Sequence, residues 1–337
     1  MNELELIDAF LSPFGLARDA RRAGAGVLSG PGDDCAVVHP TQGRKLVLKV
    51  DEVVENVHFQ PRWFAPEDVG HKALAAALSD LAAAGARPRW FLCALGVRRD
   101  ADPVRVAREM GRGMAEVARR HRCALVGGNV TRAPAWSISV TAIGDAGRPR
   151  GRRGARPGDK LVVAGELGRA ALGLRLLQGD RENDGSTRWS GRHGSLRRDR
   201  RETAAIRAQL RPEPLVAAGL AATGLAVAAV DVSDGFLRDL GHLCNASRCG
   251  CEVELSDLAI DAAVRDAGVE LALNGGEDYA LLFATRPRDA ERLAKAIRRT
   301  NTEARIVGQF VKSRGIRLLQ AGAPRPLPRD LGWDHLA

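Results

Sequence analysis

The chain has 337 residues, of which 45% are hydrophobic and 27% are charged, and its formal net charge is +10. This length predicts two packed domains, because single hydrophobic cores stop growing at roughly 250–300 residues. The acidic, amphipathic first residues lack the basic-then-apolar order of a signal peptide, and no apolar run reaches the roughly 20 residues that cross a bilayer. We therefore expect a cytoplasmic protein with no membrane partner.

The positive charge by itself would suggest a nucleic-acid partner. However, many arginines lie in two hydrophilic stretches, 148–156 and 188–201, with no regular interleaving of aromatic residues and no zinc-finger or RNA-binding signature. We interpret most of them as a solvated surface and expect no nucleic-acid partner. The six cysteines are scattered without metal-ligand spacing, which is typical of small buried side chains in a reducing compartment.

The first half of the chain alternates strand and helix signals. Strands are expected at 45–50, 91–97, 123–126 and 136–144, and helices at 66–84 and 103–121. This mixture predicts an α/β or α+β fold with a substantial sheet. A stretch rich in Arg, Gly and Pro around 145–159 predicts a boundary between domains 1–147 and 148–337.

The second half resumes with similar signals. A strand is expected at 160–164, followed by a helix through Leu177. Residues 179–203 lose all periodicity, which predicts a flexible surface insertion. Further elements are expected as a helix from Pro212, a strand ending at Val232, a helix from Ser233, a helix near 288–299, and strands near 304–308 and 315–319.

Carboxylates gather in four segments, most of them at a strand end or turn. These are Gly32-Asp33-Asp34, Asp51, Ser79-Asp80 and Asp231-Val232-Ser233-Asp234. Acidic residues near buried strand ends are costly unless a cation neutralises them. Mg²⁺ prefers such oxygen ligands, and phosphoryl transfer from ATP needs this arrangement. For single residues a turn or cap is the simpler interpretation, so Asp34 could belong to a turn and Ser233 could be a helix N-cap.

Other positions are informative only in context. Asp80 lies in an Ala- and Leu-rich helix, where a metal or a partner charge fits better than a solvated face. Two glycine pairs, 127–128 and 275–276, follow expected strands and would let the backbone approach a phosphate, although a tight turn would look the same. Neither pair matches a P-loop or a dinucleotide fingerprint. His58 could be a packed or surface histidine, and Trp333 a hydrophobic anchor.

The motifs occur in a specific order along nearly the whole chain. They are GPGDDCAVV (30–38), DEVVENVHF (51–59), SDLAAAGA (79–86), LVGGNVTR (125–132), RPEP (211–214), DVSDG (231–235), GGEDY (275–279) and GWDH (332–335). Together they resemble the thiamine-monophosphate kinases of the aminoimidazole-ribonucleotide-synthetase-like superfamily. Only the 179–203 insertion lies clearly outside this resemblance.

The resemblance implies a fold and a reaction. It implies two α/β domains and a homodimer in which the N-terminal strands form a shared β-barrel. It also implies that ATP binds with several Mg²⁺ ions and that its γ-phosphoryl group passes directly to thiamine phosphate, giving thiamine diphosphate.

The resemblance also implies roles for individual residues. Metal ligands would be Asp34, Asp51, Asp80, Asn129, Asp231 and Asp234; nucleotide contacts would be Gly128, Asn129, Arg152 and Ser233; substrate contacts would be His58, Glu277 and Trp333. Catalysis would depend on Asp80 and Asp234, and we add Lys49 as a third catalytic candidate because of its own positive charge. Trp333 could stack on the cationic thiazolium ring, with Glu277 as a negative partner.

Two residues depart from the family pattern. Asn129 replaces the usual Asp after the paired glycines, and Lys49-Val50 replaces the usual Ser or Thr before Asp51. Lys49 could occupy the space of a missing metal or touch a phosphate; alternatively it points to solvent and Asn129 is a tolerated ligand exchange. Besides an active kinase with an altered metal set, the sequence leaves open a kinase with another acceptor and a weakened homologue that binds nucleotide or thiamine phosphates.

Overall fold

The computed structural model describes residues 3–16, 26–29, 35–100, 102–179, 189, 199–329 and 331–333. These residues form two compact units. Unit 1 contains residues 3–81 and 87–147 together with Trp189, and unit 2 contains 82–86, 148–179 and 199–333. Among the described helices, none is long and apolar enough to cross a membrane.

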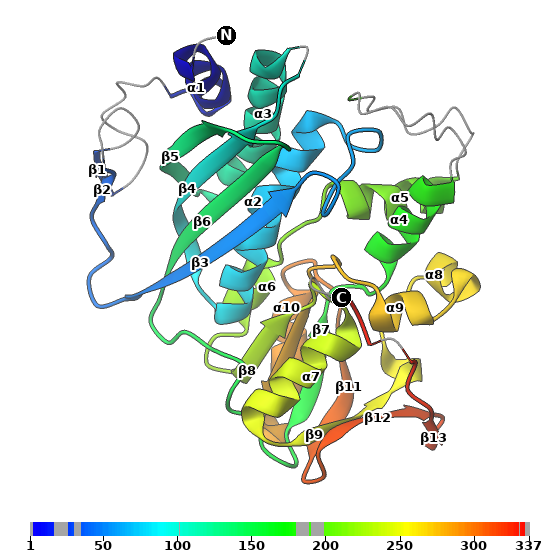
Figure 1. Ribbon diagram of the computed structural model, residues 1–337. Helices are drawn as coiled ribbons and strands as arrows, with labels where there is room; N and C mark the ends of the chain where they lie inside the picture. The colour runs from blue at the N-terminus through cyan, green and yellow to red at the C-terminus, as the bar shows by residue number, and fades with distance from the viewer. Residues whose placement is uncertain are drawn as a thin grey trace. The chain divides into compact units, whose positions relative to one another are not determined.

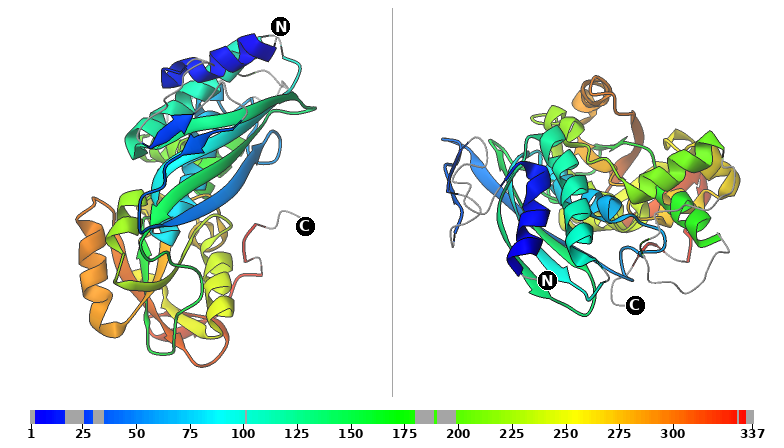
Figure 2. Two further views of the ribbon diagram at one scale, coloured as in Figure 1. Left: turned by 90° about the vertical axis from the view of Figure 1, so that its left-hand side faces the viewer. Right: turned by 90° about the horizontal axis from the view of Figure 1, so that it is seen from above.

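Unit 1 is built on a four-stranded sheet in the order β3-β6-β4-β5 (Figure 1). Its strands are β3 (Lys45–Val54), β4 (Arg87–Val97), β5 (Ala124–Arg132) and β6 (Ser137–Ala146). Strands β4 and β5 are parallel, and the other neighbours are antiparallel. Helices α1 (Glu3–Leu11), α2 (Pro66–Ala84) and α3 (Pro103–His121) lie on one face of the sheet (Figure 2). A separate ribbon pairs β1 (Val27–Ser29) with β2 (Val37–Val38).

The two long helices have the bounds that the sequence predicts. Asp102 caps α3 by accepting a hydrogen bond from the Arg105 backbone N–H. Glycine allows α2 and α3 to touch through their backbones, because a Cβ at Gly113 would lie 1.8 Å from the Glu67 carbonyl oxygen. This close contact holds α2, which carries Asp80, against α3.

The other face of this sheet carries exposed apolar side chains. Leu46, Leu48 and Val50 alternate along β3 and are 44%, 64% and 63% exposed. The sheet is open in the described part of the chain, with β3 and β5 as its edges. A single chain therefore does not form the barrel that the resemblance implies.

Unit 2 contains a seven-stranded sheet in the order β13-β12-β9-β11-β7-β10-β8. Its strands are β7 (Lys160–Ala164), β8 (Ala226–Asp231), β9 (Gly250–Glu254), β10 (Leu281–Thr285), β11 (Ala304–Val311), β12 (Gly315–Gln320) and β13 (Ala323–Arg325). Its helices are α4 (Arg169–Gly179), α5 (Arg200–Leu210), α6 (Val216–Ala221), α7 (Phe236–Ser247), α8 (Ala262–Ala267), α9 (Glu270–Asn274) and α10 (Ala290–Arg298). Only β9 and β12 pair in parallel within this sheet of the described chain.

Most expected strands are confirmed, and several continue further than predicted. The glycine pairs are an exception: Gly127 and Gly128 lie inside β5, and Gly275 and Gly276 follow helix α9 rather than a strand. A parallel partner strand supports β5 beyond the point where its own apolar run ends, which the local pattern could not reveal.

The predicted insertion needs a correction at its end. Helix α5 begins at Arg200, with Asp199 capping it through the Arg201 and Glu202 backbone N–H groups. The helix expected at Pro212 begins only at Val216. Residues 180–188 and 190–198, which hold most of the predicted flexible loop, lie outside the described residues.

Candidate active site

A charged contact in unit 1 joins strand β3 to helix α2. The Lys49 Nζ lies 2.9 Å from an Asp80 carboxylate oxygen, and the two side chains are 34% and 28% exposed. Asp51 is two residues from Lys49, so both project from the same face of β3. The alternative in which Lys49 points to solvent is therefore wrong. The partner charge that we expected for Asp80 is this ammonium group.

His58 lies in a tight turn after β3. Its Nδ1 accepts a hydrogen bond from the Val54 backbone N–H at 3.1 Å, so a neutral ring carries its proton on Nε2. The buried Lys72 donates to the His58 carbonyl oxygen at 3.4 Å and lies over the Phe64 ring. His58 is thus held by the backbone through its Nδ1 edge.

An aromatic cluster adjoins this turn, and the sequence did not indicate it. Trp189 stacks on Phe59 with ring centroids 5.8 Å apart, and its Nε1 donates to Asp100 at 3.0 Å. The Trp136 Nε1 donates to the same carboxylate oxygen at 3.3 Å. The only sequence signal was a tryptophan within an otherwise hydrophilic insertion.

The glycines of β5 have a packing role in the fold. A Cβ at Gly128 would lie 1.9 Å from the Cys93 carbonyl oxygen, so only glycine allows β4 and β5 to approach here. Asn129 of β5 pairs with Ala94 of β4. Asp51 of β3 pairs with Val140 of β6, and Val140 pairs in turn with Cys93 of β4, the neighbour of Ala94. Because neighbouring positions alternate between faces, Asn129 and Asp51 lie on opposite faces of the sheet. A single chain does not bring them together.

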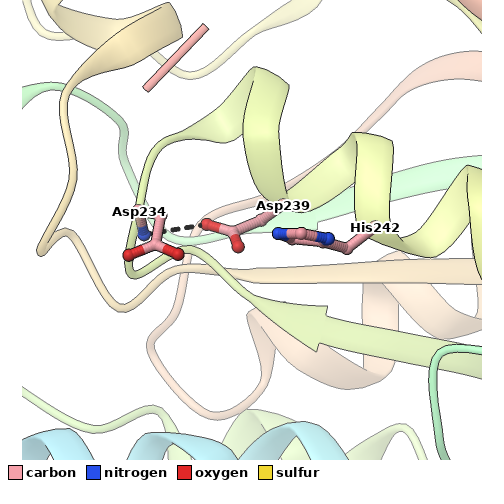
Figure 3. Close-up of side chains that lie close together, drawn as sticks. All are labelled: Asp234, Asp239 and His242. Carbon is pink, nitrogen blue, oxygen red and sulfur yellow. Dashed lines mark hydrogen bonds between the residues drawn. The ribbon is translucent and has the colours of Figure 1, made fainter. Parts of the chain in front are cut away.

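In unit 2, a turn between β8 and α7 carries the acidic motif. Asp231 is buried at the end of β8, and Asp234 lies in the turn. The Asp239 carboxylate accepts hydrogen bonds from the backbone N–H groups of Ser233, Asp234 and Gly235 at 3.0, 3.0 and 3.2 Å. Figure 3 shows the bond from Asp234. Gly235 is the N-cap of α7, so the interpretation of Ser233 as the cap is wrong. Asp239 holds the turn that presents Asp234.

Asp239 was missed by the sequence reasoning, although an acidic residue in the first turn of a helix after Ser-Asp-Gly is a usable signal. Burial raises its pKa to about 7, the backbone N–H groups lower it, and the Asp234 charge raises it. Burial and the nearby Arg152 and Arg238 lower the pKa of His242. Ligand atoms of Asp234, Asp239 and His242 lie within 4.8 Å of one another, a spacing that could hold a metal ion (Figure 3).

The GGEDY segment is attached to the same turn. The Glu277 backbone N–H donates to the Ser233 carbonyl oxygen at 2.8 Å, and Glu277 adopts a positive φ of 67°. Its carboxylate accepts a hydrogen bond of 2.6 Å from Gln209 Nε2. Gln209 is buried on α5 and is a second residue that the sequence did not single out. It fixes the direction of the Glu277 side chain.

Trp333 reaches the turn from the far end of the described chain. Its backbone N–H donates to the Asp234 carbonyl oxygen at 2.9 Å, and its side chain is 55% exposed. Gly332 has a φ of 137°, and a Cβ there would lie 2.5 Å from the same oxygen. Unit 2 thus gathers Asp231, Asp234, Glu277 and Trp333 around one turn.

Arg152 and Asp34 are two further predicted site residues. Arg152 is exposed, and its backbone carbonyl accepts a hydrogen bond from the Ser247 hydroxyl at 3.0 Å. Its positive charge is one of the causes that lower the pKa of His242. Asp34 lies outside the described residues.

Comparisons with known proteins cover most of the chain. The models "AIR synthase related protein, N-terminal domain" and "AIR synthase related protein, C-terminal domain" match residues 32–146 and 156–319. Thiamine-monophosphate kinase of Haemophilus influenzae is 33% identical over 316 residues, covering 90% of each chain. The crystal structure of thiamine-monophosphate kinase from Stenotrophomonas maltophilia matches with a TM-score of 0.80 and 34% identity, over 96% of this chain and 98% of that one. The structure described as "AaThiL complexed with AMPPCP and TMP" matches with a TM-score of 0.73 and 29% identity, over 88% and 89%.

Proposed function

The chain belongs to the thiamine-monophosphate kinase family of AIR synthase related proteins, and we propose that it transfers the γ-phosphoryl group of ATP to thiamine phosphate, giving thiamine diphosphate. The observation that carries this proposal is the turn of unit 2, where Asp231 and Asp234 lie with Glu277 and Trp333. This turn places candidate ligands for a phosphate-bound cation beside candidate contacts for a cationic aromatic ring.

Substrate orientation follows from the fixed side chains. Glu277, held by Gln209, offers a negative charge to the thiazolium ring, and the half-exposed Trp333 offers its ring face to the same cation. Orientation of this kind supplies a large part of the rate enhancement in phosphoryl transfer. The acceptor is already an ionised phosphate, so the reaction does not require a strong general base.

We further propose that the enzyme uses Mg²⁺. Each unit by itself provides carboxylate oxygens of the kind that this ion prefers, Asp51 and Asp80 in unit 1 and Asp231 and Asp234 in unit 2, so the chemistry of each donor set fits. Bound Mg²⁺ would offset the charge that develops on the transferred phosphoryl group. Lys49 adds a further positive charge on the Asp51 side of β3.

The direct test is product formation. The purified chain with ATP, Mg²⁺ and thiamine phosphate should form thiamine diphosphate, and Asp234→Asn and Asp80→Asn should each reduce the rate at least a hundredfold. Asp266→Asn is a matched control, because Asp266 is an exposed carboxylate on α8. Absence of product at every Mg²⁺ concentration would refute the proposed reaction.

We also propose that the chain is a homodimer that covers the apolar face of the unit 1 sheet. Leu46, Leu48 and Val50 are exposed on that face, and both sheet edges are open. Leu48→Glu should convert the dimer to a monomer in analytical ultracentrifugation. Leu327→Glu, at another exposed leucine, is the control and should leave the sedimentation coefficient unchanged.

One observation favours a second candidate, a weakened homologue that binds nucleotide or thiamine phosphates. Lys49 already neutralises Asp80, and Asn129 lacks the charge of the family's usual aspartate. Under this hypothesis the double substitution Lys49→Thr with Asn129→Asp would raise turnover sharply. Turnover of the unaltered chain at a rate typical of a kinase would exclude it.

A further inference from the structure

We propose that the Lys49 ammonium group is a built-in counter-ion that competes with a divalent metal ion for the Asp80 carboxylate. The chain would then bind that metal weakly alone and more tightly together with its nucleotide. This inference rests on the proposed function in one respect, because it takes Asp80 to be a metal ligand.

The contact is anchored on both sides by regular structure. Lys49 lies in the middle of β3, which pairs with β6 along its whole length. Asp80 lies in the second half of α2, between the fully buried Ser79 and Leu81. The 2.9 Å ion pair therefore joins two rigid elements, unlike a chance encounter of two mobile surface side chains.

The charges compete because both cations need the same oxygen atoms. A divalent ion bound to Asp80 would lie within a few ångströms of an ammonium group that stays in place, and like charges at about 4 Å repel by kilocalories per mole even when water screens them. The metal must therefore displace Lys49 or bind beside it. Either route weakens metal binding on the order of tenfold or more.

Nucleotide binding removes this competition. The long lysine side chain can turn from a carboxylate to a phosphate oxygen, because it carries its charge as a point at the end of four methylene groups. Once Lys49 contacts phosphate, Asp80 is released to bind the metal that accompanies the nucleotide. Metal and nucleotide would then bind with positive coupling, and Lys49 would be the residue that produces it.

The test counts and titrates Mn²⁺ on the full chain by electron paramagnetic resonance, with no turnover involved. Lys49→Met should tighten Mn²⁺ binding about tenfold in the absence of nucleotide and reduce the tightening that a non-hydrolysable ATP analogue causes. Lys45→Met is the matched control: it removes one positive charge from the exposed start of the same strand and should change Mn²⁺ affinity less than twofold. The double variant Lys49→Met with Asp80→Asn should lose the gain.

The outcomes separate this inference from the kinase activity. If Lys49→Met binds Mn²⁺ no more tightly than Lys45→Met, or if its gain persists without Asp80, the competition does not exist. Either result counts against the competition whether or not the chain forms thiamine diphosphate. Thermal unfolding of each variant shows that it is folded; the pair is partly exposed, so its loss should leave the fold intact.

Discussion

Replacing Asp239 by Asn tests a competition between burial and hydrogen bonding within the turn that presents Asp234. The Asp239 side chain is 1% exposed, and burial raises its pKa from 3.8 to about 7 even though three backbone N–H groups favour the charged form. Asn keeps the size and one acceptor oxygen but cannot ionise. The variant therefore removes the titration and leaves most of the packing.

The sign of the effect follows from linkage. The pKa of Asp239 is higher in the folded than in the unfolded chain. At pH values between these two pKa values, the folded chain therefore binds a proton at Asp239 that the unfolded chain has lost. The stability that Asp239 contributes is fully present below the unfolded pKa, near 3.8, and is lost as pH rises through the folded pKa, near 7. Between the two pKa values the free energy of unfolding that Asp239 contributes falls by about 1.4 kcal/mol per pH unit, and the fall ends near the folded pKa of about 7. The total loss between about pH 5 and pH 8 is therefore about 2–3 kcal/mol.

Urea unfolding of the wild-type chain and of Asp239→Asn at about pH 5 and pH 8 measures this difference. The advantage of the wild-type chain should be about 2–3 kcal/mol larger at the lower pH. Asp266→Asn, on an exposed carboxylate, should show no such trend. An advantage of Asp239 that is equal at both pH values would refute the reasoning and show that the three N–H donors outweigh burial.

Three further outcomes are expected. Gln209→Leu should raise the KM for thiamine phosphate several-fold, because it removes the 2.6 Å hydrogen bond that directs Glu277. The KM for ATP should change little, and steady-state kinetics with each substrate measures both KM values. Trp333→Ala should raise the KM for thiamine phosphate about tenfold and Trp333→Phe less, since cation–π contacts contribute about 1–2 kcal/mol; equal KM values for both variants would count against stacking. Gly113→Ala should lower the free energy of unfolding, measured in urea, by more than about 2 kcal/mol, because the new Cβ would overlap the Glu67 carbonyl oxygen. Gly147→Ala is the control and should have little effect, because nothing lies close to that position.

The sequence by itself determined the helices at 66–84 and 103–121, because their signals are local: proline at the first helical position, Gly85 after one helix, and apolar periodicity along the other. It also determined the family, because a set of short motifs in a fixed order does not depend on knowing which segments touch. The acidic motif of 231–234 and the role of Glu277 were predicted on that basis.

The tertiary structure decided which of these residues meet. Lys49 and Asp80 lie on a strand and a helix, and no periodicity indicates that their charges pair. The same holds for Gln209 with Glu277, and for the backbone of Trp333 with Asp234. Such contacts join segments that are distant along the chain, and they depend on packing that local propensity does not encode. The glycines of β5 illustrate the point, since the approach of a neighbouring strand, and not their own motif, requires Gly128.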